Sequence, residues 1–166
     1  MKVVSNAPPL IALSLIEKLY LLEELWEEII IPEAVYYEVV IQGKRKPGAS
    51  LIEKAVENRW IRVLQIKKEN AVKFLLPILD YGEAEAIVLA QEIQAGLVIL
   101  DNIESRLFAH QVGLKVIGTI GVILKAYEKK LIKHPLEEIY KLKSYGFYVG
   151  DNLLKYIKFL LQERKL

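Results

Sequence analysis

Polar side chains that can bind a divalent cation stand at the ends of three short apolar runs in the sequence. Asn6, Asp101 and Thr119 each come directly after such a run or one residue beyond it. If the runs are parallel strands, their carboxyl ends lie at one edge of the sheet, where ligands bind in open α/β sheets. Taken singly, each position is equally well explained by a turn or a helix cap, because Asn, Asp and Thr are common there.

Glu38 is a second candidate ligand, because its neighbours at helical spacing are apolar. Val35 and Ile41 lie three residues before and after it, on the same face of an expected helix. A carboxylate on a core-facing stripe is costly unless it is paired or binds a cation. A lysine or arginine partner, or a place at the edge of the stripe, would explain Glu38 without a ligand.

Glu83 and Glu85 open an otherwise apolar helix and point about 200° apart, since an α-helix has about 3.6 residues per turn. Asp80 followed by Glu83 is typical of a capping box, which gives Glu83 a structural role. Glu85 shares its face with Val88 and Leu89 and has no such explanation. We therefore favour Glu85 over Glu83 as a site residue.

The elements that must position these residues are short apolar strands alternating with helical patterns. We expect strands at 2–5, 29–31, 60–66, 97–100 and 115–117. We expect one or two helices over 10–26, and further helices at 33–41, 51–56, 72–79, 83–95, 102–112, 119–130, 136–144 and 153–162. This alternation predicts a three-layer α/β/α sandwich with a central parallel sheet of four to five strands. Residues 1–166 form one domain, with C-terminal helices (about 135–166) packed on it.

The composition of the 166 residues is that of a globular chain, with 53% hydrophobic and 27% charged residues. The absence of cysteine excludes disulfides and thiolate metal sites. A net charge of +2 is too small to predict nucleic-acid binding by itself. No apolar run approaches the roughly 18 residues of a membrane span, and no targeting segment is evident, so we expect a soluble, cytoplasmic protein.

Several common kinds of site are excluded by their missing motifs. His110 and His134 lack metal-ligand spacing, which argues against a zinc hydrolase. The chain has no Gly-x-x-x-x-Gly-Lys-Ser/Thr loop, no Gly-x-Gly-x-x-Gly and no Gly-x-Ser-x-Gly. The segment 118–121 is instead interpreted as a strand-to-helix turn with Thr119 as the N-cap.

Four segments of the sequence, in order, resemble the acidic blocks of PIN domains. They are VVSNAPPLIAL at 3–13, IPEAVYYEV at 31–39, GEAEA at 82–86 and VILD at 98–101. GTIGV at 118–122 and GFYV at 146–149 are similar to a prokaryotic branch of PIN-like proteins, to which toxin nucleases are related. The resemblance covers nearly the whole chain.

The resemblance implies a PIN-like fold and a divalent-metal-dependent ribonuclease with Mg²⁺ or Mn²⁺ as cofactor. Carried over position by position, the metal ligands are Asn6, Glu38, Glu85 and Asp101, with Glu83 as the substitute for Glu85. The three acids among them are also the expected catalytic residues. The resemblance further implies RNA as substrate, a toxin role with an antitoxin protein as partner, and a homodimer.

Basic residues near these blocks are candidates for contact with RNA. Arg106 lies about one helical turn past Asp101 and can contact a substrate phosphate through two hydrogen bonds. An ion pair with Glu104 or another acid explains Arg106 equally well. The run Lys44-Arg45-Lys46 can contact an RNA backbone, although a solvated loop is the simpler interpretation.

The first acidic block departs from the family pattern. Active PIN nucleases usually carry Asp at this position, where this chain has Asn6. An amide oxygen still binds Mg²⁺ but contributes no charge. The alternative function is therefore a catalytically weak or inactive PIN-like scaffold that binds RNA or a partner protein. Such a scaffold would use helices such as 153–161, where Leu153, Ile157, Leu160 and Leu161 form an apolar stripe.

Overall fold

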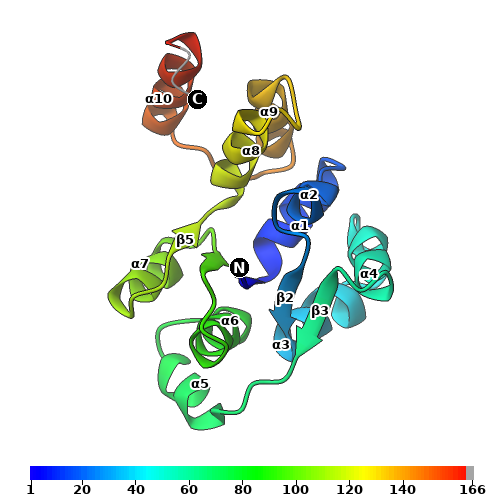
Figure 1. Cartoon of the computed structure of the whole chain (residues 1–166), viewed down its shortest axis with the longest axis vertical. Coiled ribbons are helices and arrows are strands. Elements are labelled where there is room, and N and C mark those ends of the chain that lie inside the picture. Colours follow the sequence, from blue (N-terminus) through cyan, green and yellow to red (C-terminus); the bar gives the residue numbers. More distant parts are fainter. Residues whose placement is uncertain (164–166) are drawn as a thin grey trace.

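Short β-branched strands form a single parallel sheet at the centre of the molecule (Figure 1). The structure, a computed structural model, describes residues 1–163. Within them the strands are β1 (Val3–Ser5), β2 (Ile29–Pro32), β3 (Ile61–Leu64), β4 (Leu97–Ile99) and β5 (Val116–Ile117). Their order across the sheet is β3-β2-β1-β4-β5, and every neighbouring pair is parallel. The predicted parallel sheet is confirmed, including the additional strand expected within 60–66.

The two faces of the sheet bury different apolar residues, so the strands carry no polar stripe. Val3, Ile29, Ile31 and Ile99 belong to one core cluster. Val4, Ile30, Val98 and Leu100 belong to the other. Alternate side chains of a strand point to opposite faces, which is why the clusters divide in this way. Helices cover both faces, and this confirms the predicted α/β/α sandwich.

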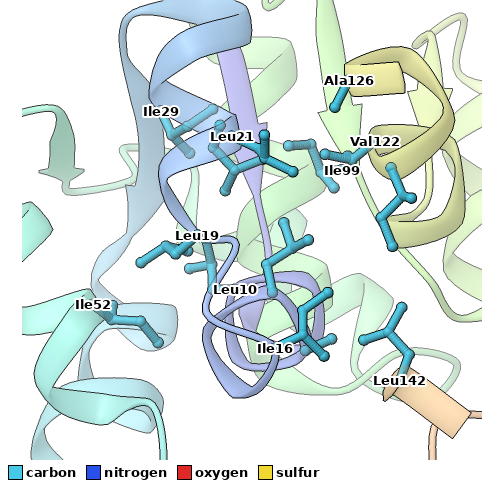
Figure 2. Packing of buried hydrophobic residues seen from close by; sticks show 14 of the residues in the cluster. Leu10, Ile16, Leu19, Leu21, Ile29, Ile52, Ile99, Val122, Ala126 and Leu142 are labelled. Atoms are coloured by element: carbon cyan, nitrogen blue, oxygen red, sulfur yellow. The ribbon is translucent and has the colours of Figure 1, made fainter. Parts of the chain in front are cut away.

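The helices follow the sequence-based expectations closely. They are α1 (Ala7–Leu15), α2 (Tyr20–Trp26), α3 (Glu33–Tyr36), α4 (Ala49–Glu57), α5 (Glu69–Leu75), α6 (Tyr81–Glu92), α7 (Ile103–Gln111), α8 (Thr119–Glu128), α9 (Pro135–Ser144) and α10 (Asp151–Gln162). Helices α1, α2 and α8 pack on one face, where Leu10, Leu21 and Val122 meet Ile99 of β4 (Figure 2). Helices α5, α6 and α7 pack on the other face. No helix among residues 1–163 is long and apolar enough to cross a bilayer.

The helix expected at 33–41 changes its winding after one turn. The α-helical α3 continues into a π-helix, η1 (Tyr37–Gln42). This wider winding buries Val39 and Val40 and leaves Glu38 and Ile41 exposed. The prediction that Glu38 lies on a core-facing stripe is therefore wrong, because it assumed 3.6 residues per turn throughout. π-Helical turns occur frequently at functional sites.

The C-terminal helices join the core of the sheet face that α1 and α8 cover. Ile139 and Leu142 of α9 are almost completely buried in it. The apolar stripe predicted for the last helix lies differently from the expectation. Leu154 and Ile157 are buried, whereas Leu153 is 45% exposed.

Candidate functional site

Asn6 ends the central strand β1 with an amide that has no hydrogen-bond partner. Its side chain is 1% exposed, and neither Oδ1 nor Nδ2 is hydrogen-bonded within the described residues. Asn6 stands at the N-cap of α1, but its side chain makes no capping bond. A buried polar group without a partner costs about 1–3 kcal/mol. Such a cost at the carboxyl edge of a parallel sheet is expected where a ligand completes the bonds.

Asp101 lies close to Asn6 because β4 is the neighbour of β1. Ser5 and Ile99 are paired in register, and the Asn6 N–H donates to the Ile99 carbonyl at 3.4 Å. The strand ends of β1 and β4 therefore place Asn6 and Asp101 at the same sheet edge. The strands that neighbour β1 are connected in opposite directions, which makes this edge the topological switch point of the sheet.

The carboxylate of Asp101 caps helix α8. Its Oδ1 accepts from the Thr119 N–H at 2.7 Å, and its Oδ2 accepts from the Thr119 hydroxyl at 2.6 Å. Thr119 is the first residue of α8 and Gly118 is the N-cap, so the predicted N-cap role of Thr119 is wrong. Burial raises the pKa of the Asp101 carboxyl, and the bonds from Thr119 and the charge of Arg106 oppose this in part.

Arg106 is held beside Asp101 by the backbone. Its Nη1 donates to the Leu100 carbonyl at 2.9 Å. Gly118 makes room for this arrangement, since a Cβ there would lie 2.7 Å from the Arg106 Nη1 and 3.0 Å from the Asp101 Oδ1. The guanidinium forms no salt bridge within the described residues, so the alternative of a pair with Glu104 is not realised there.

A second group of acids faces the start of α6. A Cβ at Gly82 would lie 3.2 Å from the Glu38 Oε2 and 3.7 Å from the Asp80 Oδ1, so both carboxylates lie against this glycine. Glu83 is 6% exposed and forms the predicted capping box with Asp80. Burial raises the pKa of the Glu83 carboxyl, and the bond from the Asp80 N–H opposes this in part. The charges of Asp80, Glu104 and Glu38 raise it further.

Glu38 is the exposed member of this group, and the side chain of Lys46 lies near it. Its side chain is exposed, and its carboxyl makes no hydrogen bond within the described residues. Desolvation of the carboxyl against Gly82 and the charge of Asp80 raise its pKa, while the nearby Lys46 lowers it. Glu38 thus offers carboxylate oxygens to the groove that it lines.

The side chain of Glu85 points away from α6 in a different direction and caps the start of α3. Its Oε2 accepts from the Ala34 N–H at 2.9 Å, in the first turn of α3. Burial raises the pKa of its carboxyl, the Ala34 bond opposes this, and the charges of Glu33 and Glu69 raise it. Glu85 and Glu38 both line a groove of about 630 Å³, but the acids that act on Glu85 are not those that act on Glu83.

The side chains of this edge are of the type that binds a hard divalent cation, although the acids do not cluster around one point. Carboxylate and amide oxygens are the ligands that Mg²⁺ and Mn²⁺ prefer. Among residues 1–163, no three His, Cys, Asp or Glu side chains stand close enough to hold one ion. The unpaired Asn6 amide and the free Glu38 carboxylate are the groups with bonds left to make.

Sequence reasoning did not predict the contacts that Asp80, Lys46 and Thr119 make at this edge. Asp80 was given only its capping role, yet its charge also acts on Glu38. Lys46 belongs to the basic run at 44–46, and only the fold brings it beside Glu38. Thr119 was placed at the sheet edge, but its two bonds to Asp101 join residues 18 apart and leave no periodic signal.

Two comparisons with known proteins bear on the identity of this chain. A family model described as a PIN domain matches residues 2–163. A search of curated proteins gives no match.

Proposed function

The chain belongs to the PIN-domain family, and on this premise we propose that it is a divalent-metal-dependent ribonuclease that hydrolyses phosphodiester bonds in RNA. The observation that carries the proposal is the buried, unpartnered amide of Asn6 beside Asp101 at the switch point of the sheet. This is where the fold collects oxygen ligands, and an amide without a partner at that point is satisfied by a ligand.

Asn6, Glu38, Glu83 and Asp101 would hold Mg²⁺ or Mn²⁺. We prefer Glu83 to Glu85 as the third acid, because the charge of Glu38 acts on the Glu83 carboxyl, whereas the charges that act on Glu85 are those of Glu33 and Glu69. A bound divalent cation keeps clustered carboxylates ionised and acidifies water, so that a phosphodiester can be attacked at neutral pH. Side-chain rotations would have to bring the acids closer, because no three of them stand close enough to hold one ion among residues 1–163.

The other residues of the edge position the ligands and the substrate. Thr119 fixes both oxygens of Asp101, which leaves their outer lone pairs for coordination. Arg106, held by the Leu100 carbonyl, presents its remaining N–H groups to a phosphate. Burial and the charge of Asp80 raise the pKa of the Glu38 carboxyl, and a bound cation would lower it again and keep the carboxylate charged.

The test is cleavage of a labelled RNA by the purified chain. We expect cleavage with Mn²⁺ or Mg²⁺, none with EDTA, and a loss of about 100-fold or more in Glu38→Gln. Glu128→Gln is the matched control, because Glu128 is exposed at the far end of α8. Cleavage that persists in EDTA or is unchanged in Glu38→Gln would refute the proposal.

A toxin role, with a small antitoxin protein as partner and a homodimer as the working form, is the finer part of the proposal. It rests on the family resemblance. Induced expression is then expected to arrest growth of a bacterial host, and Glu38→Gln to relieve the arrest.

A second function, an inactive scaffold that binds RNA or a protein, is favoured by two features. The first block carries an amide in place of a carboxylate, and the acids form no preassembled group of three among residues 1–163. RNA binding with no cleavage under any metal condition would establish this function instead.

A further inference from the structure

Asp101 also lines a groove of about 470 Å³ that is separate from the groove lined by Glu38. Helices α7 and α8, the segment 147–150 and the start of α10 line it. Asp101 and Arg106 line it, and so do the aromatic residues Phe147 and Tyr148. The groove therefore begins at the candidate site, and its size falls within the roughly 300–1,000 Å³ of small-molecule pockets.

The wall of this groove carries an aromatic ring that the fold does not use. Tyr148 is 88% exposed, whereas Phe147 beside it is half-buried and packs on the core. An almost fully exposed aromatic ring beside a charged site is typical of the platforms on which single-stranded nucleic acids stack their bases. Apolar contacts in the groove, such as Ile120 and Leu124, suit the face of a base equally well.

The positively charged Arg106, which lines the groove, can bind a phosphate. The Arg106 guanidinium uses one nitrogen for the Leu100 carbonyl and has no salt-bridge partner within the described residues. Arginine can offer two parallel N–H donors to a phosphate. A phosphate at Arg106 and a base on Tyr148 would both lie in this one groove, because both residues line it.

We propose that this groove holds the unpaired nucleotide next to the scissile phosphate, with its base on Tyr148 and its phosphate at Arg106. The proposal rests on the proposed function, since Asp101 joins the groove to the site. It makes single-stranded RNA the substrate class, because the bases of a duplex are stacked on each other and cannot reach a side-chain ring.

The test is binding of a labelled single-stranded RNA to the full chain in EDTA at low salt, followed by fluorescence anisotropy. We expect Tyr148→Ala to weaken binding roughly tenfold, since base stacking on an aromatic ring is worth about 1–3 kcal/mol. Tyr148→Phe keeps the ring and is expected to bind within about twofold of the native chain. Tyr145→Ala is the matched control, because Tyr145 is also exposed (58%) but does not line the groove. Duplex RNA of the same sequence is expected to be insensitive to Tyr148→Ala.

Cleavage by the native chain, measured with Mn²⁺ on the same preparation, separates the two proposals. If RNA affinity depends on Tyr148 but no cleavage occurs, the nucleotide-binding role of the groove is supported and the proposed nuclease function is refuted. If the native chain cleaves RNA but the native, Tyr148→Ala and Tyr148→Phe chains bind it equally well, the role of the groove is refuted and the nuclease function is retained. An absence of RNA binding, or an effect of Tyr148→Ala on self-association alone, also overturns the groove.

Discussion

Glu83 and Glu85 are equally buried residues of one helix whose carboxylates serve different neighbours. Each is 6% exposed, and each accepts one backbone hydrogen bond. Glu83 bonds within its own capping box and feels the charge of Glu38, while Glu85 reaches across to α3. Sequence spacing showed that the two point apart, but it could not show which of them points toward Glu38. That choice depends on where η1 and Asp80 place their carboxylates.

The pair offers a closely matched comparison for metal binding. In both Glu83→Gln and Glu85→Gln the amide oxygen can still accept the backbone bond, and only the charge is lost. We expect Glu83→Gln to weaken Mn²⁺ binding about tenfold or more, and Glu85→Gln to change it less than about twofold. Isothermal titration calorimetry measures both. The opposite order would return Glu85 to the ligand set and remove Glu83.

Asn6 is an amide at the position where the resemblance to PIN nucleases leads us to expect an aspartate, and its replacement tests that difference. Asn6→Asp adds a charge at a position that is 1% exposed, so the metal-free protein should lose at least about 1 kcal/mol of unfolding free energy. With Mn²⁺ the same charge becomes a ligand, and affinity should rise about tenfold. Urea unfolding in EDTA and calorimetry give the two values. Equal Mn²⁺ affinity in both chains would mean that residue 6 does not contact the ion.

Among the elements, helix α8 depends on the strand β4 that precedes it by 20 residues. Gly118 has no side chain to cap the helix, and Asp101 supplies the bonds from the end of β4. Asp101→Ala should cost about 1–2 kcal/mol of unfolding free energy through the lost cap. Thr119→Val, which removes only the hydroxyl bond, should cost about 1 kcal/mol. Urea denaturation of both variants in EDTA checks this, and an unchanged Asp101→Ala chain would refute the capping role.

The elements themselves were largely predictable, because their signals are local. Apolar runs predicted all five strands seen in residues 1–163, and Asp80 with Glu83 predicted the start of α6. The π-helical turn was not predictable, since Tyr37–Gln42 has no residue that marks a change of winding. The exposure of Glu38 follows from that π-helical turn. The wrong prediction of a regular α-helix at 33–41 therefore led to the wrong prediction that Glu38 faces the core.

At the scale of the whole molecule, the sheet order gathers groups that are far apart in sequence. β1 lies between β2 and β4, so Asn6, the helix after β2 and Asp101 approach one edge. The alternation of strands and helices predicted that the strands are parallel. It could not predict the order of the strands across the sheet, because that order leaves no periodic pattern in the sequence. The family resemblance was confirmed over residues 2–163, and it supplied the grouping that periodicity could not.

The acids of this edge should make the stability of the metal-free protein depend on pH. The pKa values of Glu38, Glu83 and Asp101 are raised, with desolvation as the main cause. The folded chain therefore holds protons that the unfolded chain releases, and this stabilisation is complete below the ordinary carboxyl pKa. It is lost as the pH rises through the raised values. In EDTA the unfolding free energy should fall as the pH rises above the ordinary carboxyl range, and a Glu38→Gln, Glu83→Gln double variant should flatten that fall.

The central claim is that this edge of the sheet binds one divalent cation through carboxylates from separate elements. Calorimetric titration of the native chain with Mn²⁺ tests it most directly, with the Glu38→Gln, Asp101→Asn double variant as comparison. These substitutions remove two charges that belong to different helix–strand units of the fold. The account predicts one saturable site in the native chain that is lost in the variant. No binding to the native chain at millimolar Mn²⁺, or equal binding to both, would contradict it.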